Sequence, residues 1–419
     1  MPRSATTLAK TTHPEQHEDQ QTNTAAPPAP ARWIWLAAWP VTAVFVLSNA
    51  ATPLYVLWQH DIGFSKGTLT VVFACYIVGL LGSLLVSGVA SDRWGRKPVL
   101  LPALALSLLA CAIFATATTV TALLIARLFT GIAVGAVVSA GMAAVTDVAG
   151  PHRQRLAALL ASTAMVFGAG LGPFLAGLLS ETLPAPTTTV FVVEAVLLTT
   201  ALLATLRMPV PRPTTTTGAW IRVPRVPRGA GLRLALGIAV FAPGITATSF
   251  VVSLGPSVLA TLLNTPSRTV AGTLAFAMFA TATAVQFTVR ALPRTTILLA
   301  GATSTALGMA ALVTAVHTQA VAPLVTSALL AGAGQGMGQL GGLSLLNSSV
   351  PPRRLAEANA AFNVGGYLPA GALPVAAGYL SDAVGLTTGA TLFGSALLAL
   401  AVLGGAVVLA ARPRLTTSA

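Results

Sequence analysis

The sequence predicts an all-α membrane protein with twelve transmembrane helices, arranged as two six-helix bundles. Three observations predict this fold class. The chain is 55% apolar and 8% charged, whereas a soluble domain carries about 25% charged residues. Its mean hydropathy of +0.81 indicates a surface solvated by lipid rather than by water. Finally, the apolar residues fall into twelve long runs, and the last six runs repeat features of the first six.

Each apolar run is long enough to cross a bilayer as a helix. A spanning helix needs roughly 20 apolar residues, because each residue rises about 1.5 Å through a core about 30 Å thick. Backbone groups in lipid must hydrogen-bond to one another, and the sequence lacks the short alternating segments of a β-barrel, so the runs are predicted to be helices. The predicted spans are 33–57, 68–90, 98–118, 121–147, 156–180, 187–207, 231–254, 269–290, 296–316, 321–349, 356–380 and 386–410.

A polar segment separates the first six runs from the last six. Residues 208–230 contain five prolines and several arginines, which predicts a solvated linker, because proline removes backbone donors and stiffens the chain. The expected organisation is a disordered cytoplasmic tail over 1–31, a six-helix bundle over 32–207, a cytoplasmic linker over 208–230, a second bundle over 231–411 and a cytoplasmic tail over 412–419.

The two bundles are expected to be related by a pseudo-twofold axis. At a constant offset of 201 residues, glycines, prolines and acids of the two halves coincide. Transporters built from parallel repeats of this kind place the substrate between the halves, near the membrane midplane. The clearest matches are Gly131 with Gly332, Gly135 with Gly336, Pro173 with Pro374, and Glu181 with Asp382.

The formal charge of +13 is a topology signal rather than a sign of nucleic-acid binding. If both termini are cytoplasmic and the helices alternate, all of the 23 basic residues except Lys66, Arg127 and Arg268 lie on the cytoplasmic side, as the positive-inside rule requires. The excess of arginine over lysine and the abundant alanine suggest a bacterium with a GC-rich genome, so we expect a multi-pass protein of the bacterial inner membrane. Cys75 and Cys111 fall within spans and predict neither a disulfide nor a metal site.

Residues 88–100, GVASDRWGRKPVL, form a charged segment between the second and third spans. Its glycines permit a tight turn. The segment resembles G-x-L-x-D-R-x-G-R-[KR]-x-x-L, the motif that joins the second and third helices in major facilitator superfamily transporters. The matching residues are Gly88, Asp92, Arg93, Gly95, Arg96 and Lys97.

The resemblance implies a latch between the halves. The family's acid lies near the N-terminus of the eleventh helix, so Asp92 would lie near Ala356, where the helix dipole favours an anion. The family's arginine pairs with an acid at the end of the fourth helix, so Arg96 would pair with Asp147. These contacts would hold the outward-facing state and break as the halves rock. The alternative is an ordinary basic cytoplasmic loop.

Arg127 opens an R-x-x-x-G-x-x-x-G pattern in the fourth span. An arginine within the membrane costs about 2.5–3.5 kcal/mol on insertion scales, so it is expected to face a cavity or a partner. A similar arginine assists proton transfer in the drug antiporters of the superfamily. The alternative is that Arg127 snorkels to the outer interface.

The fifth span contains Gly168, Gly172, Pro173 and Gly177. This spacing resembles the antiporter motif G-x-x-x-G-P-x-x-G-G, with Ala176 in place of one glycine. The resemblance favours efflux over uptake. The alternative is the small-residue packing that is common in membrane helices.

Proton-coupling candidates follow from the few acids, since the chain has ten. Most fall in the tail, in loops or at helix ends, and the remaining two are Asp147, near the cytoplasmic end of the fourth span, and Glu194, well inside the sixth. We expect Glu194, Asp147 or Arg127 to carry coupling. Two observations oppose this expectation: the sixth helix is usually peripheral, and the first span has no acid where many drug antiporters have one.

A central cavity is expected between the halves. Gln335 and Gln339 are four residues apart, and so are Asn359 and Asn363, which places each pair on one helix face. Such a cavity suits an uncharged or amphipathic ligand, although amides at these positions could instead pack between helices. The candidate lining residues are Asn49, Tyr76, Ser249, Gln335, Gln339, Asn363 and Tyr367.

The sequence therefore predicts a monomeric proton-coupled exporter of a drug-like compound, with a small-molecule substrate, the lipid bilayer as surroundings, no metal and no cofactor beyond the proton gradient. The alternative is an importer or exporter of a metabolite such as a sugar or an amino acid. A membrane-embedded enzyme is not expected, because the sequence shows no metal cluster or nucleophile constellation.

Overall fold

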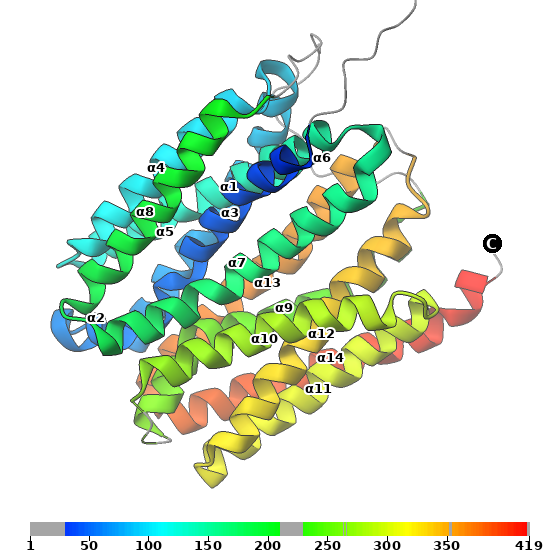
Figure 1. The fold of residues 1–419 in the computed structure, drawn as a ribbon. Helices are drawn as coiled ribbons and strands as arrows, with labels where there is room; N and C mark the ends of the chain where they lie inside the picture. The colour runs from blue at the N-terminus through cyan, green and yellow to red at the C-terminus, as the bar shows by residue number, and fades with distance from the viewer. Residues whose placement is uncertain (1–29, 210–228, 263, 265, 352–353, 417–419) are drawn as a thin grey trace, which may run out of the picture.

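The computed structural model describes residues 30–209, 229–262, 264, 266–351 and 354–416, and in these ranges the chain is helical with short connections and no strand (Figure 1). The predicted tail over 1–31 and the linker over 208–230 lie almost entirely outside the described residues. The first half contains α1 (Ala31–Ala50), a 3₁₀ turn (Thr52–Leu54), α2 (Tyr55–Ile62), α3 (Lys66–Trp94), α4 (Lys97–Ala115), α5 (Val120–Ala136), a π-helical turn (Val137–Gly141), α6 (Met142–Ala149), a 3₁₀ turn (Pro151–Arg153), α7 (Gln154–Thr182) and α8 (Pro186–Arg207). The second half contains α9 (Gly231–Thr261), α10 (Arg268–Val289), α11 (Arg294–Thr318), α12 (Val321–Asn347), α13 (Leu355–Val384) and α14 (Leu386–Thr416).

The described residues include 10 helices that are long and apolar enough to span a membrane. They correspond to ten of the twelve predicted spans. The other two predicted spans are α12 and α13, which have 27 and 30 residues. At about 1.5 Å per residue both are long enough to cross, but their glycines and amides lower the mean hydropathy. The count of twelve spans stays a prediction.

Two predicted spans are not continuous α-helices. The first, predicted over 33–57, breaks after Ala50 at the 3₁₀ turn that contains Pro53, because proline cannot donate the next helical hydrogen bond. The fourth, predicted over 121–147, contains the π-helical turn between α5 and α6. Such turns are frequent at functional sites, and Val138 of this one lines the cavity described below.

The helices pair in the same order in the two halves. In the first half α1 packs on α7, α3 on α5, and α4 on α8; in the second half α9 packs on α13, α10 on α12, and α11 on α14. The halves meet through α7 against α10 and α3 against α13, which run between the two groups of helices in Figure 1. We call the end where α8 ends and α9 begins the linker end, and the opposite end, where α3 and α10 begin, the distal end.

Close helix contacts repeat at the offset found in the sequence. A Cβ atom on Gly131 of α5 would lie 2.0 Å from the carbonyl oxygen of Tyr76, and one on Gly332 of α12 would lie 2.2 Å from that of Met278. Only glycine permits such an approach of two helix backbones. The repeated glycines therefore bring α5 onto α3 in one half and α12 onto α10 in the other.

Candidate functional site: a central cavity

A cavity of about 420 Å³ lies between the two halves, lined by side chains from both. All seven cavity residues predicted from the sequence line it: Asn49, Tyr76, Ser249, Gln335, Gln339, Asn363 and Tyr367. Helical spacing found Gln335, Gln339 and Asn363, because amides one turn apart share a helix face; the other four are single polar residues of helices that were expected to line the cavity. Sequence reasoning missed three further polar lining residues, which do not belong to a pair of amides: Thr248 of α9 and Thr283 and Gln286 of α10.

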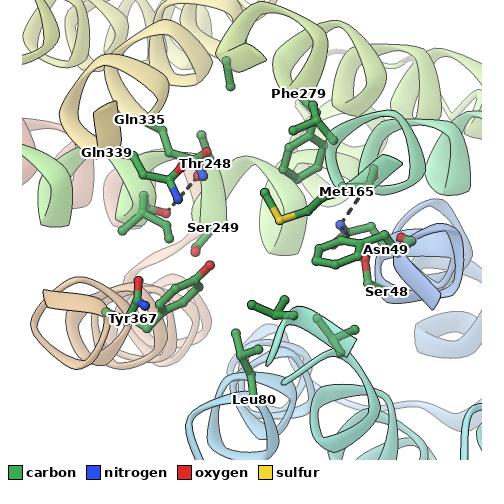
Figure 2. A pocket seen from close by; sticks show the side chains of 18 of the residues that line it. Ser48, Asn49, Leu80, Met165, Thr248, Ser249, Phe279, Gln335, Gln339 and Tyr367 are labelled. Atoms are coloured by element: carbon green, nitrogen blue, oxygen red, sulfur yellow. Dashed lines mark hydrogen bonds between the residues drawn. The ribbon is translucent and has the colours of Figure 1, made fainter. Parts of the chain in front are cut away.

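The two walls of the cavity differ in chemistry. The second half supplies most of the amide and hydroxyl groups, from α9, α10, α12 and α13. The first half supplies mainly apolar side chains, from α1, α3, the π-helical turn and α7. Figure 2 shows Gln335, Gln339 and Tyr367 across the cavity from Asn49 and Met165. The lining contains no aspartate, glutamate, lysine, arginine or histidine among the described residues.

The amides also differ in their hydrogen bonding. Asn49 of α1 donates from Nδ2 to Ser48 Oγ at 3.2 Å and to the carbonyl oxygen of Ala169 at 3.4 Å. By contrast, Gln335 Oε1 and Asn359 Oδ1 are buried without a protein partner. A buried polar atom without a partner loses about 1–3 kcal/mol of solvation that nothing replaces. In the observed rotamers both oxygens are closed off from the cavity, so a solute would meet either oxygen only after its amide group has turned.

Arg127 lies behind the first-half wall of the cavity with its side chain fully buried. Its Nε donates to the hydroxyl of Tyr55 and its Nη1 to the carbonyl oxygen of Ser48 at 2.6 Å. The carbonyl of Ser48 belongs to the last turn of α1, which lacks helical partners. Arg127 thus ties α5 to both sides of the break between α1 and α2, and the snorkelling alternative is wrong.

The aromatic rings around Arg127 complete its surroundings. Its guanidinium carbon lies 5.1 Å from the ring centre of Tyr55, 5.9 Å from that of Phe114 and 6.0 Å from that of Phe73. These distances are within the range of cation–π attraction. No carboxylate among the described residues pairs with Arg127, and its Nη2 has no partner.

The 88–97 motif forms a compact charged cluster at the linker end. Arg96 donates from Nε to Asp147 at 2.8 Å and from Nη1 to Asp92 at 2.7 Å. Burial opposes the charge of Arg96, but the hydrogen bonds to Asp147 and Asp92 prevail and raise the pKa of its guanidinium. The predicted pair of Arg96 and Asp147 is thus in contact, and all three side chains belong to the first half.

Of the remaining residues of this motif, Gly95 forms the turn and the others lie in the flanking helices. Gly95 adopts φ +94°, a backbone conformation that favours glycine. Gly88 is buried within α3, and Arg93 lies in the last turn of that helix. Lys97 donates to the carbonyl oxygen of Leu206 at 2.8 Å. The predicted position of Asp92 against the start of α13 adjoins residues 352–353, which lie outside the described residues, and stays a prediction.

Glu194 and Asp147, the acids predicted to couple protons, do not line the cavity. Glu194 lies on α8, which packs on α4 and α1, with 2% of its side chain exposed and Oε2 without a partner. Asp147 has 34% of its side chain exposed and is engaged by Arg96. Glu194 is therefore a buried carboxyl group at the periphery of the first half.

The glycines of the fifth-span motif bring α7 against other backbones. A Cβ atom on Gly168 would lie 2.6 Å from the carbonyl oxygen of Thr42, and one on Gly172 would lie 2.0 Å from that of Val46, both in α1. Gly177 faces the start of α10 across the interface between the halves, where its Cβ would lie 2.3 Å from the carbonyl oxygen of Arg268. Pro173 meets Gly272 of α10 in the same interface.

At the distal end, two carboxylates join the halves, and sequence reasoning had set both aside as ordinary helix-end acids. Glu181, at the end of α7, accepts hydrogen bonds from the backbone N–H of Arg268 and the hydroxyl of Thr269, at the start of α10. Asp382, at the end of α13, accepts from the backbone N–H groups of Lys66 at 3.0 Å and Gly67 at 2.7 Å, at the start of α3. Their match at the 201-residue offset was the signal that could have found them.

Comparisons with known proteins agree with this architecture. The model of the Major Facilitator Superfamily matches residues 34–368. The multidrug resistance protein MdtL of Escherichia coli O139:H28 is 28% identical over 116 residues, which cover 27% of this chain and 30% of that protein. Among solved structures, the nucleoside transporter NupG has a TM-score of 0.71 at 13% identity, with 90% of this chain and 99% of that chain covered. A POT family transporter in complex with 5-aminolevulinic acid has a TM-score of 0.73 at 12% identity, covering 92% and 96%.

Proposed function

We propose that this chain, which belongs to the Major Facilitator Superfamily, is a secondary transporter that moves an amphipathic, drug-like compound out of a bacterial cell by alternating access, driven by the proton gradient. The observation that carries the proposal is the cavity between the two halves, lined by both of them. Rocking of the halves about such a cavity would expose a bound solute to one side of the membrane and then to the other.

Three observations support efflux over metabolite transport. The partial similarity to MdtL points to drug resistance, the fifth-span motif resembles that of antiporters, and apolar side chains form most of one cavity wall. The basic residues around Arg96 and Lys97 at the linker end support a cytoplasmic location of that end, by the positive-inside rule. The protein would then lie in the inner membrane with both termini in the cytoplasm.

The test of this function is transport by the purified full chain in proteoliposomes with an imposed pH gradient. Loading the vesicles with a panel of fluorescent amphipathic dyes should reveal gradient-driven movement of at least one dye, abolished by a protonophore. Movement of sugars or amino acids in the absence of dye movement would instead establish the metabolite alternative.

Glu194→Gln is expected to abolish the dependence of transport on the pH gradient and to leave folding intact. The amide has the same shape but cannot carry a proton, and Glu194 is the most buried acid of the described residues. Counterflow, which needs no gradient, should continue. The matched control is Asp61→Asn, which removes an exposed acid that bonds to its neighbour His60. An unchanged pH dependence in the Glu194 variant would show that coupling lies elsewhere.

Neutralising both distal carboxylates, Glu181→Gln with Asp382→Asn, is expected to shift the halves toward a state open at the distal end. Each carboxylate accepts hydrogen bonds from the first turn of a helix in the other half, where the helix dipole adds about 0.3–1 kcal/mol for an exposed acid. Losing both should change the ratio of open to closed states by about tenfold.

Spin labels on the exposed residues Thr118 and Gln319, at the distal ends of the two halves, report this change. With Cys75 and Cys111 replaced, the distance distribution between the labels should gain a longer component in the double variant. Asp61→Asn is the control, because Asp61 is an exposed acid that bonds to its neighbour His60. A distribution that does not respond to the double variant contradicts a role of these carboxylates in closing the distal end.

A further inference from the structure

We propose that the cavity binds an uncharged solute that presents N–H or O–H donors to the amides of α12 and α13 and an apolar face to the first half. This inference rests on the proposed transport function and specifies its substrate class. Three features of the cavity support it: two amide oxygens without a protein partner on one side, an apolar wall on the other side, and the buried positive charge of Arg127 behind that wall.

The second-half wall of the cavity carries amides that helical periodicity places on one face of each helix. Gln335 and Gln339 lie one turn apart on α12, and Asn359 and Asn363 lie one turn apart on α13. Gln335 Oε1 and Asn359 Oδ1 have no protein partner. Rotation about the last side-chain bond is soft in both residues, so each oxygen can turn toward a solute. Each partnerless oxygen accepts from an O–H or N–H group, so a solute with such donors satisfies it, and the NH2 groups of the same amides can donate to acceptors of the solute.

The opposite wall has few polar groups. The amide of Asn49 is already bonded to Ser48 and Ala169, and apart from Ser48 and Tyr76 the other lining side chains of this wall are apolar. Burial of apolar surface there would contribute about 25 cal/mol per Å², independent of orientation. The apolar lining residues of this wall include Phe45, Phe73, Leu80, Leu84, Val134 and Met165.

The charge distribution argues against a cationic solute. The lining has no acid among the described residues, so a cation would lose its hydration without gaining a counter-charge. In addition, the guanidinium of Arg127 lies 6.0 Å from the ring of Phe73 and bonds to the carbonyl of Ser48, and both of these residues line the cavity. Its unpaired charge, acting through a medium of low dielectric, raises the energy of a second cation nearby.

An anion is disfavoured as well. The lining offers no lysine, arginine or histidine to pair with it, so an anion would lose its hydration without gaining a counter-charge in the lining. A neutral solute with donors on one edge satisfies both walls. The volume of about 420 Å³ falls in the range of about 300–1,000 Å³ for drug-sized ligands.

The experiment compares matched ligands on purified full-length protein in nanodiscs. Several aryl scaffolds, benzanilide among them, are each prepared in four forms: a neutral phenol with its N–H intact, an O- and N-methylated form without donors, a trimethylammonium cation and a carboxylate anion. Binding is measured by titration calorimetry and by the ligand-induced rise in melting temperature.

The neutral donor form is expected to bind at least tenfold more tightly than the other three. Gln335→Leu and Asn359→Leu should each weaken it by about tenfold, the worth of one hydrogen bond with its desolvation, and should leave the methylated form unchanged. Asn347→Leu is the matched control, because Asn347 is an exposed amide on the same helix outside the cavity lining.

The other outcomes separate the two proposals. The proposed substrate class is wrong if the cationic, anionic or methylated form binds more tightly than the neutral donor form. It is also wrong if the leucine variants bind the neutral donor form as tightly as the wild type. In either case, transport of a solute of another class would still support the proposed function. If no scaffold binds in any form and no dye moves in proteoliposomes, the proposed function fails as well.

Discussion

Gly172→Ala is expected to destabilise the protein by about 3 kcal/mol, the upper part of the range for overpacked cores, and to abolish transport. The added Cβ would lie 2.0 Å from the carbonyl oxygen of Val46 in α1. Because the obstructing atom is backbone, no side-chain rotation relieves the clash, and α7 must move away from α1. That movement would displace Asn49 and Ala169, which bond across the same pair of helices and line the cavity.

Thermal unfolding of purified variants, followed together with dye transport, measures this effect. Gly82→Ala is the matched control: Gly82 also lies within a spanning helix, and its Cβ would meet nothing within 4 Å. Alanine there should leave stability unchanged or raise it by about 0.5–1 kcal/mol, since glycine is the poorer helix former. Gly168→Ala, whose Cβ would lie 2.6 Å from the carbonyl of Thr42, should fall between the two. Equal melting temperatures for the Gly172 and Gly82 variants would contradict the close packing of α7 on α1.

Periodic features of the sequence were sufficient for most of the fold. Apolar runs of about 20 residues locate the helices, and the four-residue spacing of Gln335 and Gln339 places both side chains on one face. The family resemblance supplied the contact of Arg96 with Asp147. These features are local, or they repeat along the chain, so they can be found without coordinates.

Contacts between residues far apart in the sequence could not be predicted from the sequence alone. The depth of Arg127 in its span is compatible with both snorkelling and burial, and the outcome depends on its contacts with Ser48 of α1 and Tyr55 of α2. The separation of Glu194 from the cavity likewise depends on how α8 packs, which composition does not specify. In α12 and α13, the same amides that line the cavity, together with glycines, lower the mean hydropathy of the helix. These two spans are therefore harder to recognise by hydropathy.

Arg127→Met is expected to reduce transport by about tenfold to a hundredfold while leaving the melting temperature unchanged or higher. The guanidinium is fully buried, and no carboxylate among the described residues pairs with it. Removing the charge relieves the desolvation penalty of a buried ion, which is several kcal/mol when no counter-charge repays it. The same change removes the hydrogen bonds to Tyr55 and Ser48, worth about 1.5–3 kcal/mol when the donor is charged, and with them the tie across the break between α1 and α2.

Arg127→Lys is expected to lower the melting temperature, in contrast to Arg127→Met. Lysine keeps the buried charge, but a single ammonium group cannot reproduce the two directed bonds of the planar guanidinium, so this variant should melt below both the wild type and the methionine variant. The transport rate of the lysine variant should lie between those of the wild type and the methionine variant, because one hydrogen bond to Ser48 or Tyr55 can still form. Melting temperatures and initial transport rates of the three proteins, measured side by side, decide the matter. If methionine unfolds the protein and lysine is harmless, Arg127 contributes mainly to stability, and its proposed role in positioning the cavity end of α1 is wrong.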